Sequence, residues 1–371
     1  MVKGGVKTPP AKWLRFRLMR HKNLSSIRRK LLRWYDQNRR DLPWRRTGDP
    51  YAIWIAETML QQTQVATVVP YYERFLDTFP TVDALARAPL KKVLALWSGL
   101  GYYRRARNLK LAARILVRRY AGHLPANYDD LLALPGVGDY TAGALMSIAF
   151  QKPYPAIDGN ARRVLGRLFN LTGEKKLRSA AADLVSRSRP GHFNQGLMEL
   201  GATICTPKNP RCPKCPLRRD CAAQNGDGRM ATTAKKYTGV KAVTWPLAVV
   251  RRRGKILLRR RAADGILAGL WELPGGEIRG HKSARACLKR HLRELDGTLK
   301  SDLHIGEFRH SITNRRVRSP LYLFDVRIDT ELSRPGPNWR WISPSSLDGY
   351  PVSSMTRKAL RILATYEKSF L

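Results

Sequence analysis

Four of the chain's five cysteines fall in one short stretch, and this cluster constrains the possible fold more than any other feature. Cys205, Cys212, Cys215 and Cys221 are spaced C-x6-C-x2-C-x5-C within seventeen residues, while Cys287 stands alone. An odd count and a tight cluster are typical of metal ligation in a reducing compartment, and not of a disulfide framework. The single CxxC favours one [4Fe–4S] cluster; structural zinc, which usually takes two separated CxxC pairs, is the alternative.

Basic residues decorate this loop and dominate the whole chain. The loop carries Lys208, Arg211, Lys214, Arg218 and Arg219, and the chain holds 69 Lys and Arg against 28 Asp and Glu, a formal charge of +41. Phosphate neutralisation gives such proteins most of their sequence-independent affinity for nucleic acid. Nucleic acid is therefore the expected partner, with a ribosome-associated surface as the alternative. No apolar run is long enough for a membrane span, so a membrane partner is not expected.

The chain is long enough for two domains, because single cores stop growing near 250–300 residues. From Ile27 to Cys221 the apolar spacing is helical, with about ten helices and almost no strand, and the polar stretch Gln224–Val240 resembles a linker. The first 35 residues hold eleven Lys and Arg and no acid, as in a DNA-contacting arm or an organellar transit segment. The predicted organisation is a basic extension over 1–26, a helical domain over 27–223, a linker over 224–243 and a second domain over 244–371.

The second domain has the pattern of an α+β fold. Apolar runs at Trp245–Val250 and Lys255–Leu258 flank Arg253-Gly254 like a hairpin, and Pro320–Val326 is typical of a strand. A helix is predicted from Ser283 to Leu295, between these strands. The chain is thus predicted to be a mostly α domain followed by a smaller α+β domain.

The stretch LPGVGDYTA, Leu134 to Ala142, joins two predicted helices. Gly136 and Gly138 permit positive φ and expose backbone N–H groups at a helix N-terminus, where a phosphate is favoured. The pattern predicts a helix-hairpin-helix over 131–145 that contacts the DNA backbone through Gly136, Val137 and Gly138. An ordinary interhelical turn is the alternative reading.

Two carboxylates stand out from the surface charges. Glu57 lies in Tyr51–Leu60, a helix that is apolar on nearly every side, so burial should raise its pKa toward that of a general acid. Asp158 precedes the helix Ala161–Phe169 and is expected to cap it, and N–H contacts should keep it ionised. Two carboxyls with opposed pKa values suit the cleavage of a glycosidic bond through an oxocarbenium-like state.

These residues resemble a known family, the helix-hairpin-helix glycosylases that include endonuclease III and, within them, the MutY adenine glycosylases. The resemblance runs from about Arg39 to Cys221 and more weakly through the second domain. Together with the hairpin and the cysteine spacing, it rests on Leu42-Pro43-Trp44-Arg45, Glu57-Thr58-Met59-Leu60-Gln61-Gln62-Thr63-Gln64-Val65, Gly99-Leu100-Gly101-Tyr102-Tyr103 and Ile157-Asp158-Gly159-Asn160.

The resemblance implies hydrolysis of the N-glycosidic bond of adenine mispaired with 8-oxoguanine or guanine, the adenine being flipped into a pocket. It implies that Glu57 protonates adenine N7 and activates water, while Asp158 stabilises the sugar cation or bonds to it transiently. Further implied roles are support of that carboxylate by Tyr140 and Asn160, an adenine pocket lined by Trp44, Arg45, Leu60 and Gln195, and base-stack wedges at Gln62 and Tyr102.

Tyr140 bears on the outcome of the reaction. By resemblance, bifunctional endonuclease III-like enzymes carry a Lys at this position, whose amine forms a Schiff base and allows strand cleavage. A tyrosine here implies a monofunctional enzyme that removes the base and leaves the strand uncut.

The second domain keeps the register of a Nudix box from Gly276 to Gly297 but lacks most of its acids. By resemblance, Lys282, His291 and Leu295 stand where a Nudix hydrolase carries metal-binding or basic Glu residues, and Glu294 alone cannot hold Mg²⁺. A Nudix-like lesion-recognition domain without hydrolysis is implied. Its Phe-Ser-His turn, which inspects 8-oxoguanine, has Phe308, Arg309 and His310 as nearest match, followed by Ser311, so Arg309 replaces the serine.

Three other functions fit parts of the pattern: a T:G mismatch thymine glycosylase, a non-catalytic iron–sulfur DNA-binding or redox-sensing protein, and a Nudix hydrolase of oxidised nucleotides. The Nudix-like domain opposes the first, the intact Glu57 and Asp158 oppose the second, and the missing acids oppose the third. The expected partner is double-stranded DNA with A:8-oxoguanine or A:G mismatches, bound by a monomer. The expected location is the bacterial cytoplasm, at the nucleoid, with organellar targeting as the alternative.

Overall fold

The structure is a computed structural model that describes residues 23–225, 239–262, 265–278, 280, 283–293, 299–312, 314–326 and 336–369. Two compact units make up the chain: unit 1 is Met1–Arg87 with Asn108–Lys235, and unit 2 is Ala88–Arg107 with Lys236–Leu371. Most of the predicted extension and linker lies outside the described residues, as do Lys282 and Glu294–Gly297 of the Nudix register. Among the described residues, no helix has the length and hydropathy of a membrane span.

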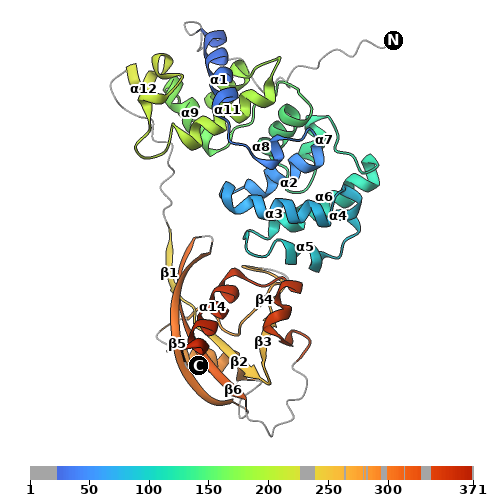
Figure 1. Ribbon diagram of the computed structural model, residues 1–371, viewed down its shortest axis with the longest axis vertical. Helices are drawn as coiled ribbons and strands as arrows, with labels where there is room; N and C mark the ends of the chain where they lie inside the picture. The colour runs from blue at the N-terminus through green and yellow to red at the C-terminus, as the bar shows by residue number, and fades with distance from the viewer. Residues whose placement is uncertain are drawn as a thin grey trace. The chain divides into compact units, whose positions relative to one another are not determined.

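Residues 23–225 contain helices and no strand, which confirms the predicted helical domain. Figure 1 shows these helices in blue to yellow-green. Their bounds are α1 Leu24–Asn38, α2 Pro50–Leu60, α3 Val65–Thr78, α4 Val82–Arg87, α5 Leu90–Leu96, α6 Arg104–Tyr120, α7 Tyr128–Leu132, α8 Asp139–Ala144, α9 Gly159–Phe169, α10 Glu174–Leu184, α11 Pro190–Thr203 and α12 Ala222–Asn225, with 3-10 turns at Pro43–Arg45, Cys212–Lys214 and Arg218–Asp220.

One core of unit 1 forms where α1, α9, α10 and α11 meet. Ile27, Leu165, Leu184 and Phe193 are among its buried side chains. Burial of such side chains contributes roughly 1.5–3 kcal/mol each, which orders these helices although most are short. Cys205, Cys215 and Cys221 pack against this core, so the cysteine loop is attached to it.

The predicted hairpin joins α7 to α8. Gly136 has φ +83°, as expected, and a side chain there would meet Asn108. Gly138 has φ −104° and ψ −179°, so the prediction of a positive φ at Gly138 is wrong: as the N-cap of α8 it needs only extended backbone. After α8 the chain continues through a π-helical turn, Leu145–Ala149.

Unit 2 contains a sheet of seven strands in the described residues, and Figure 1 shows it in yellow to red. Strands β2 and β3 form the predicted hairpin around Arg253-Gly254, while β6 pairs in parallel with β1 and β2 and antiparallel with β5. The bounds are β1 Lys241–Thr244, β2 Leu247–Arg252, β3 Lys255–Arg260, β4 Trp271–Glu272, β5 Leu299–Ile312, β6 Arg315–Val326 and β7 Trp339–Ile342, with helices α13 Ala284–His291 and α14 Ser354–Lys368.

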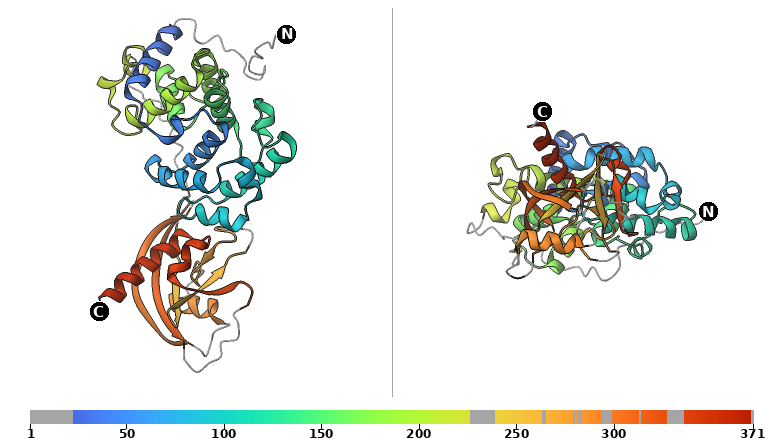
Figure 2. Two further views of the ribbon diagram at one scale, coloured as in Figure 1. Left: turned by 45° about the vertical axis from the view of Figure 1, so that its right-hand side comes forward. Right: turned by 90° about the horizontal axis from the view of Figure 1, so that it is seen from below.

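The two helices cover opposite faces of this sheet. Leu247 and Val249 of β2 share a core with Ala359 of α14, whereas the alternate residues Ala248 and Val250 pack with Leu288 of α13. Alternation places successive strand residues on opposite faces. Figure 2 shows α14, in dark red, lying across the sheet. The α+β prediction for this domain is confirmed.

A segment of the helical sequence belongs to unit 2. Within it, Ser98 Oγ donates to Val352 O at 2.7 Å and Tyr103 Oη donates to the same carbonyl at 3.1 Å. Arg357 Nε donates to Ser98 Oγ at 3.1 Å, and Arg107 Nη2 donates to Ala268 O. Ser98 and Tyr103 are buried. These bonds join residues 88–107 to the C-terminal part of the chain as one folded body.

Candidate active site

Glu57 is a buried carboxyl in the middle of α2. Asp49 caps this helix and Pro50 begins it, and the residues from Tyr51 to Met59 are all buried. Burial raises the pKa of Glu57 to about 7, against the lowering effect of a hydrogen bond from Tyr140. The carboxyl therefore exchanges its proton near neutral pH, as the apolar setting predicts.

Tyr140, in the first turn of α8, donates its hydroxyl to Glu57 Oε2. Tyr140 was predicted to support Asp158, but its hydroxyl bonds to Glu57 instead. Burial, and then the charges of Glu57 and Asp158, raise the pKa of Tyr140 well above its ordinary value. Tyr140 therefore stays a neutral donor within electrostatic range of both carboxyls.

Asp158 is the N-cap of α9, as predicted. Its Oδ1 accepts from Ala161 N at 2.6 Å, and its Oδ2 accepts from Asn160 Nδ2 at 3.0 Å. Burial raises the pKa of Asp158, while these hydrogen bonds lower it. The expected depression of this pKa is therefore not found, because burial outweighs the cap. The difference in pKa between the two carboxyls therefore comes from Glu57, whose pKa is raised to about 7.

A chain of hydrogen bonds connects Asp158 with the start of the cysteine loop. Arg163, one turn after Asn160 on α9, donates from Nη2 to Asn160 Oδ1 at 2.8 Å and from Nε to Cys205 O at 2.7 Å. Asn160 in turn holds Asp158. Arg163 was not among the predicted site residues, although its position three residues after Asn160 is the signal that could have identified it.

Arg45 is fixed by a carboxylate that the motif analysis also missed. Glu199 Oε2 accepts from Arg45 Nη2 at 2.7 Å, and Glu199 accepts from Arg40 through both oxygens. Burial opposes the charge of Glu199, but these two arginines outweigh it and lower its pKa. Glu199 follows Gln195 by one helical turn on α11, and that spacing could have revealed it.

The other predicted adenine-pocket residues occupy the same unit. Trp44 is buried with its ring edge-on to Tyr72 at 5.3 Å, and Leu60 ends α2, half-buried. Gln195 Oε1 accepts from Tyr35 Oη at 2.9 Å, and Arg45 lies over the Tyr35 ring. The charge of Arg45 lowers the pKa of Glu57, so Arg45 lies within electrostatic range of the carboxyl.

The two predicted wedge residues are exposed and have unusual backbones. Gln62 has φ +58° and Tyr102 has φ +47°, a region that non-glycine residues seldom adopt. Such strain is retained where the surrounding structure enforces it, often at functional sites. Gln62 belongs to unit 1 and Tyr102 to unit 2.

The hairpin glycines expose their backbone. Gly136 and Gly138 are exposed, and within the described chain no backbone bond uses their N–H groups. Val137 is different, because it is buried and its N–H bonds to Leu134 O at 3.1 Å. Contact with a phosphate is therefore open to the two glycines and not to Val137.

The four cysteines are free thiols whose charges influence one another. Burial, followed by the charges of Cys205, Cys221 and Cys212, raises the pKa of Cys215 to about 11. Arg167, a buried arginine, donates to Cys205 Sγ at 3.4 Å, and its Nε has no hydrogen-bond partner among the residues that the structure describes. A buried guanidinium beside converging thiols matches a bound group with net negative charge.

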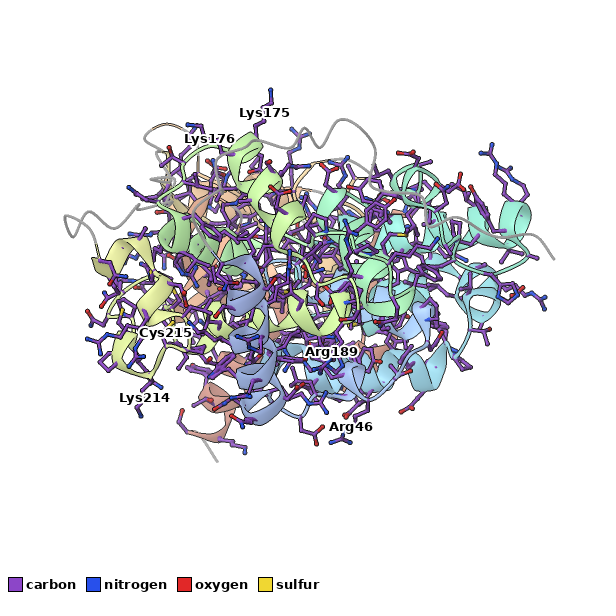
Figure 3. The ribbon with its side chains drawn as sticks, turned by 90° about the horizontal axis from the view of Figure 1, so that it is seen from above. Arg46, Lys175, Lys176, Arg189, Lys214 and Cys215 are labelled. Carbon is purple, nitrogen blue, oxygen red and sulfur yellow. The ribbon has the colours of Figure 1, made fainter. Side chains whose placement is uncertain are left out.

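The loop that carries the cysteines is basic and exposed. Among the described residues, no three His, Cys, Asp or Glu side chains are grouped closely enough to hold one metal ion. The five predicted basic residues of the loop are all exposed, and Figure 3 shows Lys214 beside Cys215 on the loop.

The predicted lesion-reading residues lie in strand β5 and not in a turn. Phe308 is buried in the unit 2 core, and His310 Nε2 contacts Ser354 Oγ at 3.2 Å. Strand alternation directs Phe308 and His310 inward, and the inspection of a lesion by Phe308 stays a prediction. Arg309 and Ser311, on the other face, are exposed.

The chain matches the HhH-GPD superfamily of base excision DNA repair proteins over residues 55–188 and a NUDIX domain over residues 247–361. The adenine DNA glycosylase of Rattus norvegicus is 34% identical over 93% of this chain and 79% of its own length. That of Homo sapiens is 33% identical over 91% and 74%. Among solved structures, a thermostable thymine-DNA glycosylase matches with TM-score 0.53 and 32% identity, over 56% of this chain and 99% of that one.

Proposed function

The chain belongs to the adenine DNA glycosylases of the HhH-GPD superfamily and removes adenine from DNA in base excision repair, and we propose that its substrate is adenine opposite 8-oxoguanine or guanine. The adenine glycosylases resemble both domains, whereas the thymine-DNA glycosylase structure covers 56% of the chain. The extent of similarity therefore favours adenine over a thymine substrate.

The proposed chemistry uses the two carboxyls in different protonation states. Protonated Glu57 donates to adenine N7, the bond between the base and the sugar breaks, and ionised Asp158 stabilises the positive charge on the sugar. Glu57, now ionised, accepts a proton from the attacking water. The observation that carries this proposal is Tyr140, which bonds to Glu57 and lies within electrostatic range of Asp158.

Strand cleavage is not part of the proposed reaction. A lyase step needs an amine that forms a Schiff base with the sugar. Tyr140, the position where the resemblance places such a Lys, instead keeps its proton, since its pKa is raised. The product is therefore an abasic site in an intact strand.

We propose that Cys205, Cys212, Cys215 and Cys221 hold one [4Fe–4S] cluster. The single CxxC spacing and the buried Arg167 guanidinium at Cys205 Sγ support this proposal. When bound, a cluster would link the four thiolates and fix the loop, whose exposed arginines and lysines then face the DNA backbone.

Selectivity for 8-oxoguanine is proposed to reside in Arg309 and Ser311, since both are exposed on one face of β5. Arg309 or Ser311 would donate a hydrogen bond to the damaged guanine. If so, Arg309→Ala or Ser311→Ala lowers the rate ratio of A:8-oxoguanine to A:G. A ratio unchanged in both variants would refute this assignment.

The test is single-turnover incubation of the purified protein with duplexes holding A:8-oxoguanine, A:G or T:G, with and without alkali. We expect alkali-labile sites at adenine only. Glu57→Gln should abolish excision and spare DNA binding, while Glu73→Gln, an exposed glutamate of α3, serves as the matched control. Absence of alkali-labile sites at adenine would refute the proposal, and cleavage before alkali would refute the monofunctional reaction.

A further inference from the structure

Unit 2 contains a cavity of about 470 Å³ that is lined mainly by basic side chains. It lies between the end of β3, the end of α13 and the start of β7. Its lining includes Arg259, Arg260, Arg261, Arg290, Arg293 and Trp339. It is formed entirely by residues of the second domain, away from the proposed catalytic carboxyls in sequence.

The sheet and α13 bring these arginines together. Arg259 of β3 is paired in register with Trp339 of β7, and its guanidinium lies 5.8 Å from that ring's centre. Leu288 and Leu292 are buried against the opposite strands, so the last turn of α13 carries Arg290 to the cavity. The positions are fixed by packing and pairing, although the tips of the side chains reach solvent.

The cavity has a large excess of positive charge. Among the described residues its lining contains no acidic side chain, and Glu272 accepts from Arg261 at 2.8 Å and lies 4.0 Å from Arg259. In the described chain, no acid pairs with Arg260, Arg290 or Arg293. Arginines at one concave site repel each other unless an anion neutralises them.

His291, which also lines the cavity, reports this potential. Burial, and then the charges of Arg259, Arg290 and Arg261, lower the pKa of His291 to about 4. Its Nδ1 is 3.3 Å from Arg259 Nη1. The imidazole is therefore neutral at physiological pH, and an anion in the cavity would raise its pKa.

We propose that this cavity binds the phosphate groups of a ligand directly through its guanidinium groups, without a divalent metal. Arginine matches phosphate by paired hydrogen bonds, and several arginines on a concave wall suit adjacent phosphates. The chain matches a NUDIX domain here, but at the cavity His291 stands where the resemblance places a Glu, and Arg290 and Arg293 lie beside it. The site therefore retains an anion and does not hydrolyse it. This goes beyond the proposed adenine excision.

Two sources of phosphate share this chemistry: the backbone of a DNA strand, and free pyrophosphate or a nucleoside diphosphate. The first arm of the test titrates the full-length protein with inorganic pyrophosphate in EDTA by calorimetry. The double variant Arg260→Glu/Arg290→Glu should bind pyrophosphate at least about tenfold more weakly, the effect of losing one charge-assisted contact. Arg361→Glu, an exposed arginine of α14, is the control for charge.

The second arm measures the affinity for a mismatch-free duplex across salt concentrations. If the phosphates come from DNA, the slope of log affinity against log salt should fall by about 2 in the double variant, since each contact contributes about 0.9. If they come from a free ligand, pyrophosphate binding is lost and the slope stays unchanged. A rise in the His291 pKa on saturation is expected in either case.

The proposal is overturned if the protein does not bind pyrophosphate without metal and the double variant has the same salt slope as Arg361→Glu. It is also overturned if Mg²⁺ is required for pyrophosphate binding. Should the charge reversal lower the melting temperature, Arg260→Gln/Arg290→Gln replaces it, since it removes the two charges without introducing acids.

Discussion

At the scale of single residues, Glu57 and Asp158 set the expected pH dependence. The reaction as proposed needs Glu57 protonated and Asp158 ionised. Since the pKa of Glu57 is about 7, its protonated fraction falls as pH rises through 7. Single-turnover rates between pH 5 and 9 should fall about tenfold per pH unit well above 7 and should also fall at the acidic end. A rate that is constant from pH 7 to 9 would contradict the role of Glu57 as the acid.

Glu57 also links pH to stability. Its folded pKa, about 7, lies above its ordinary value of 4.5, so the folded state holds this proton more tightly than the unfolded state. The contribution is present below pH 4.5 and is lost as pH rises through 7. Glu57→Gln should therefore melt at a higher temperature than wild type at pH 8, with the difference shrinking toward pH 5. Equal differences at both values would show that Glu57 is not buried as described.

Glu199 is predicted to position Arg45. Glu199→Gln weakens the ion pairs with Arg40 and Arg45, so the free energy of unfolding should fall by about 2 kcal/mol. This loss is smaller than the ~3–5 kcal/mol of a fully buried pair, because the Arg40 side chain is 42% exposed. Release of Arg45, whose charge lowers the pKa of Glu57, should move the alkaline limb of the rate profile to higher pH. Calorimetry and the pH profile test this, with Glu73→Gln as control, and loss of stability without movement of the limb would leave Glu199 with a structural role only.

Some properties of the site residues could be predicted from the sequence, and others could not. Glu57 could be identified because every neighbour on its helix is apolar, and Asp158 because it precedes a helix. The partner of Tyr140 could not, since the hydroxyl reaches a residue 83 positions away. The upward shift of the Asp158 pKa was also not predicted. Helix capping can be recognised from neighbouring residues in the sequence, whereas burial depends on how the whole chain packs.

At the scale of elements, α9 and α11 approach each other through Gly201. A Cβ at Gly201 would lie 2.6 Å from Asn160 Cβ, and Asn160 is the residue that holds Asp158. Gly201→Ala should therefore cost about 1–3 kcal/mol in unfolding free energy and lower kcat more than it changes DNA affinity. Gly48→Ala, where nothing lies within 4 Å, is the control. Wild-type turnover in a folded Gly201→Ala protein would contradict the prediction.

The cysteine loop gives the second prediction at this scale. Since three of its cysteines pack against the unit 1 core, removing iron under chelating and anaerobic conditions should lower the melting temperature and weaken DNA binding. Metal analysis and the visible absorption spectrum would follow the loss. A colourless protein that contains zinc as isolated would contradict the cluster, whatever its stability.

Helices and strands were predicted well where the pattern of residues within the element itself identifies it. The β2–β3 hairpin follows from two apolar runs around Arg253-Gly254. Residues 308–311 were predicted to form a turn. That prediction rested on a resemblance in three residue types, which carries no information about the pairing of this segment with β6. The register of the β5–β6 hairpin, which pairs Phe308 with Ser319, and the packing of this face against α14 decide that Phe308 belongs to the core.

At the scale of the whole molecule, the presence of two domains could be predicted from composition, but the residues that belong to each domain could not. Nothing local in residues 88–107 marks them as part of unit 2, because their contacts, such as the bond from Ser98 to Val352, span 254 positions. In a protein truncated after Lys235, we expect the backbone amides of residues 98–103 to exchange hydrogen faster than in the full chain. Equal protection in both proteins, measured by mass spectrometry, would contradict this.

The shared bond at Val352 has a consequence for how the chain is made. During synthesis, Ser98 and Tyr103 leave the ribosome long before their partner carbonyl exists, so the second body cannot close until Val352, 254 positions after Ser98, has been synthesised. Contacts of such high sequence separation slow folding. The nascent protein therefore passes through a stage in which residues 98–103 have been made but lack the carbonyl that holds them.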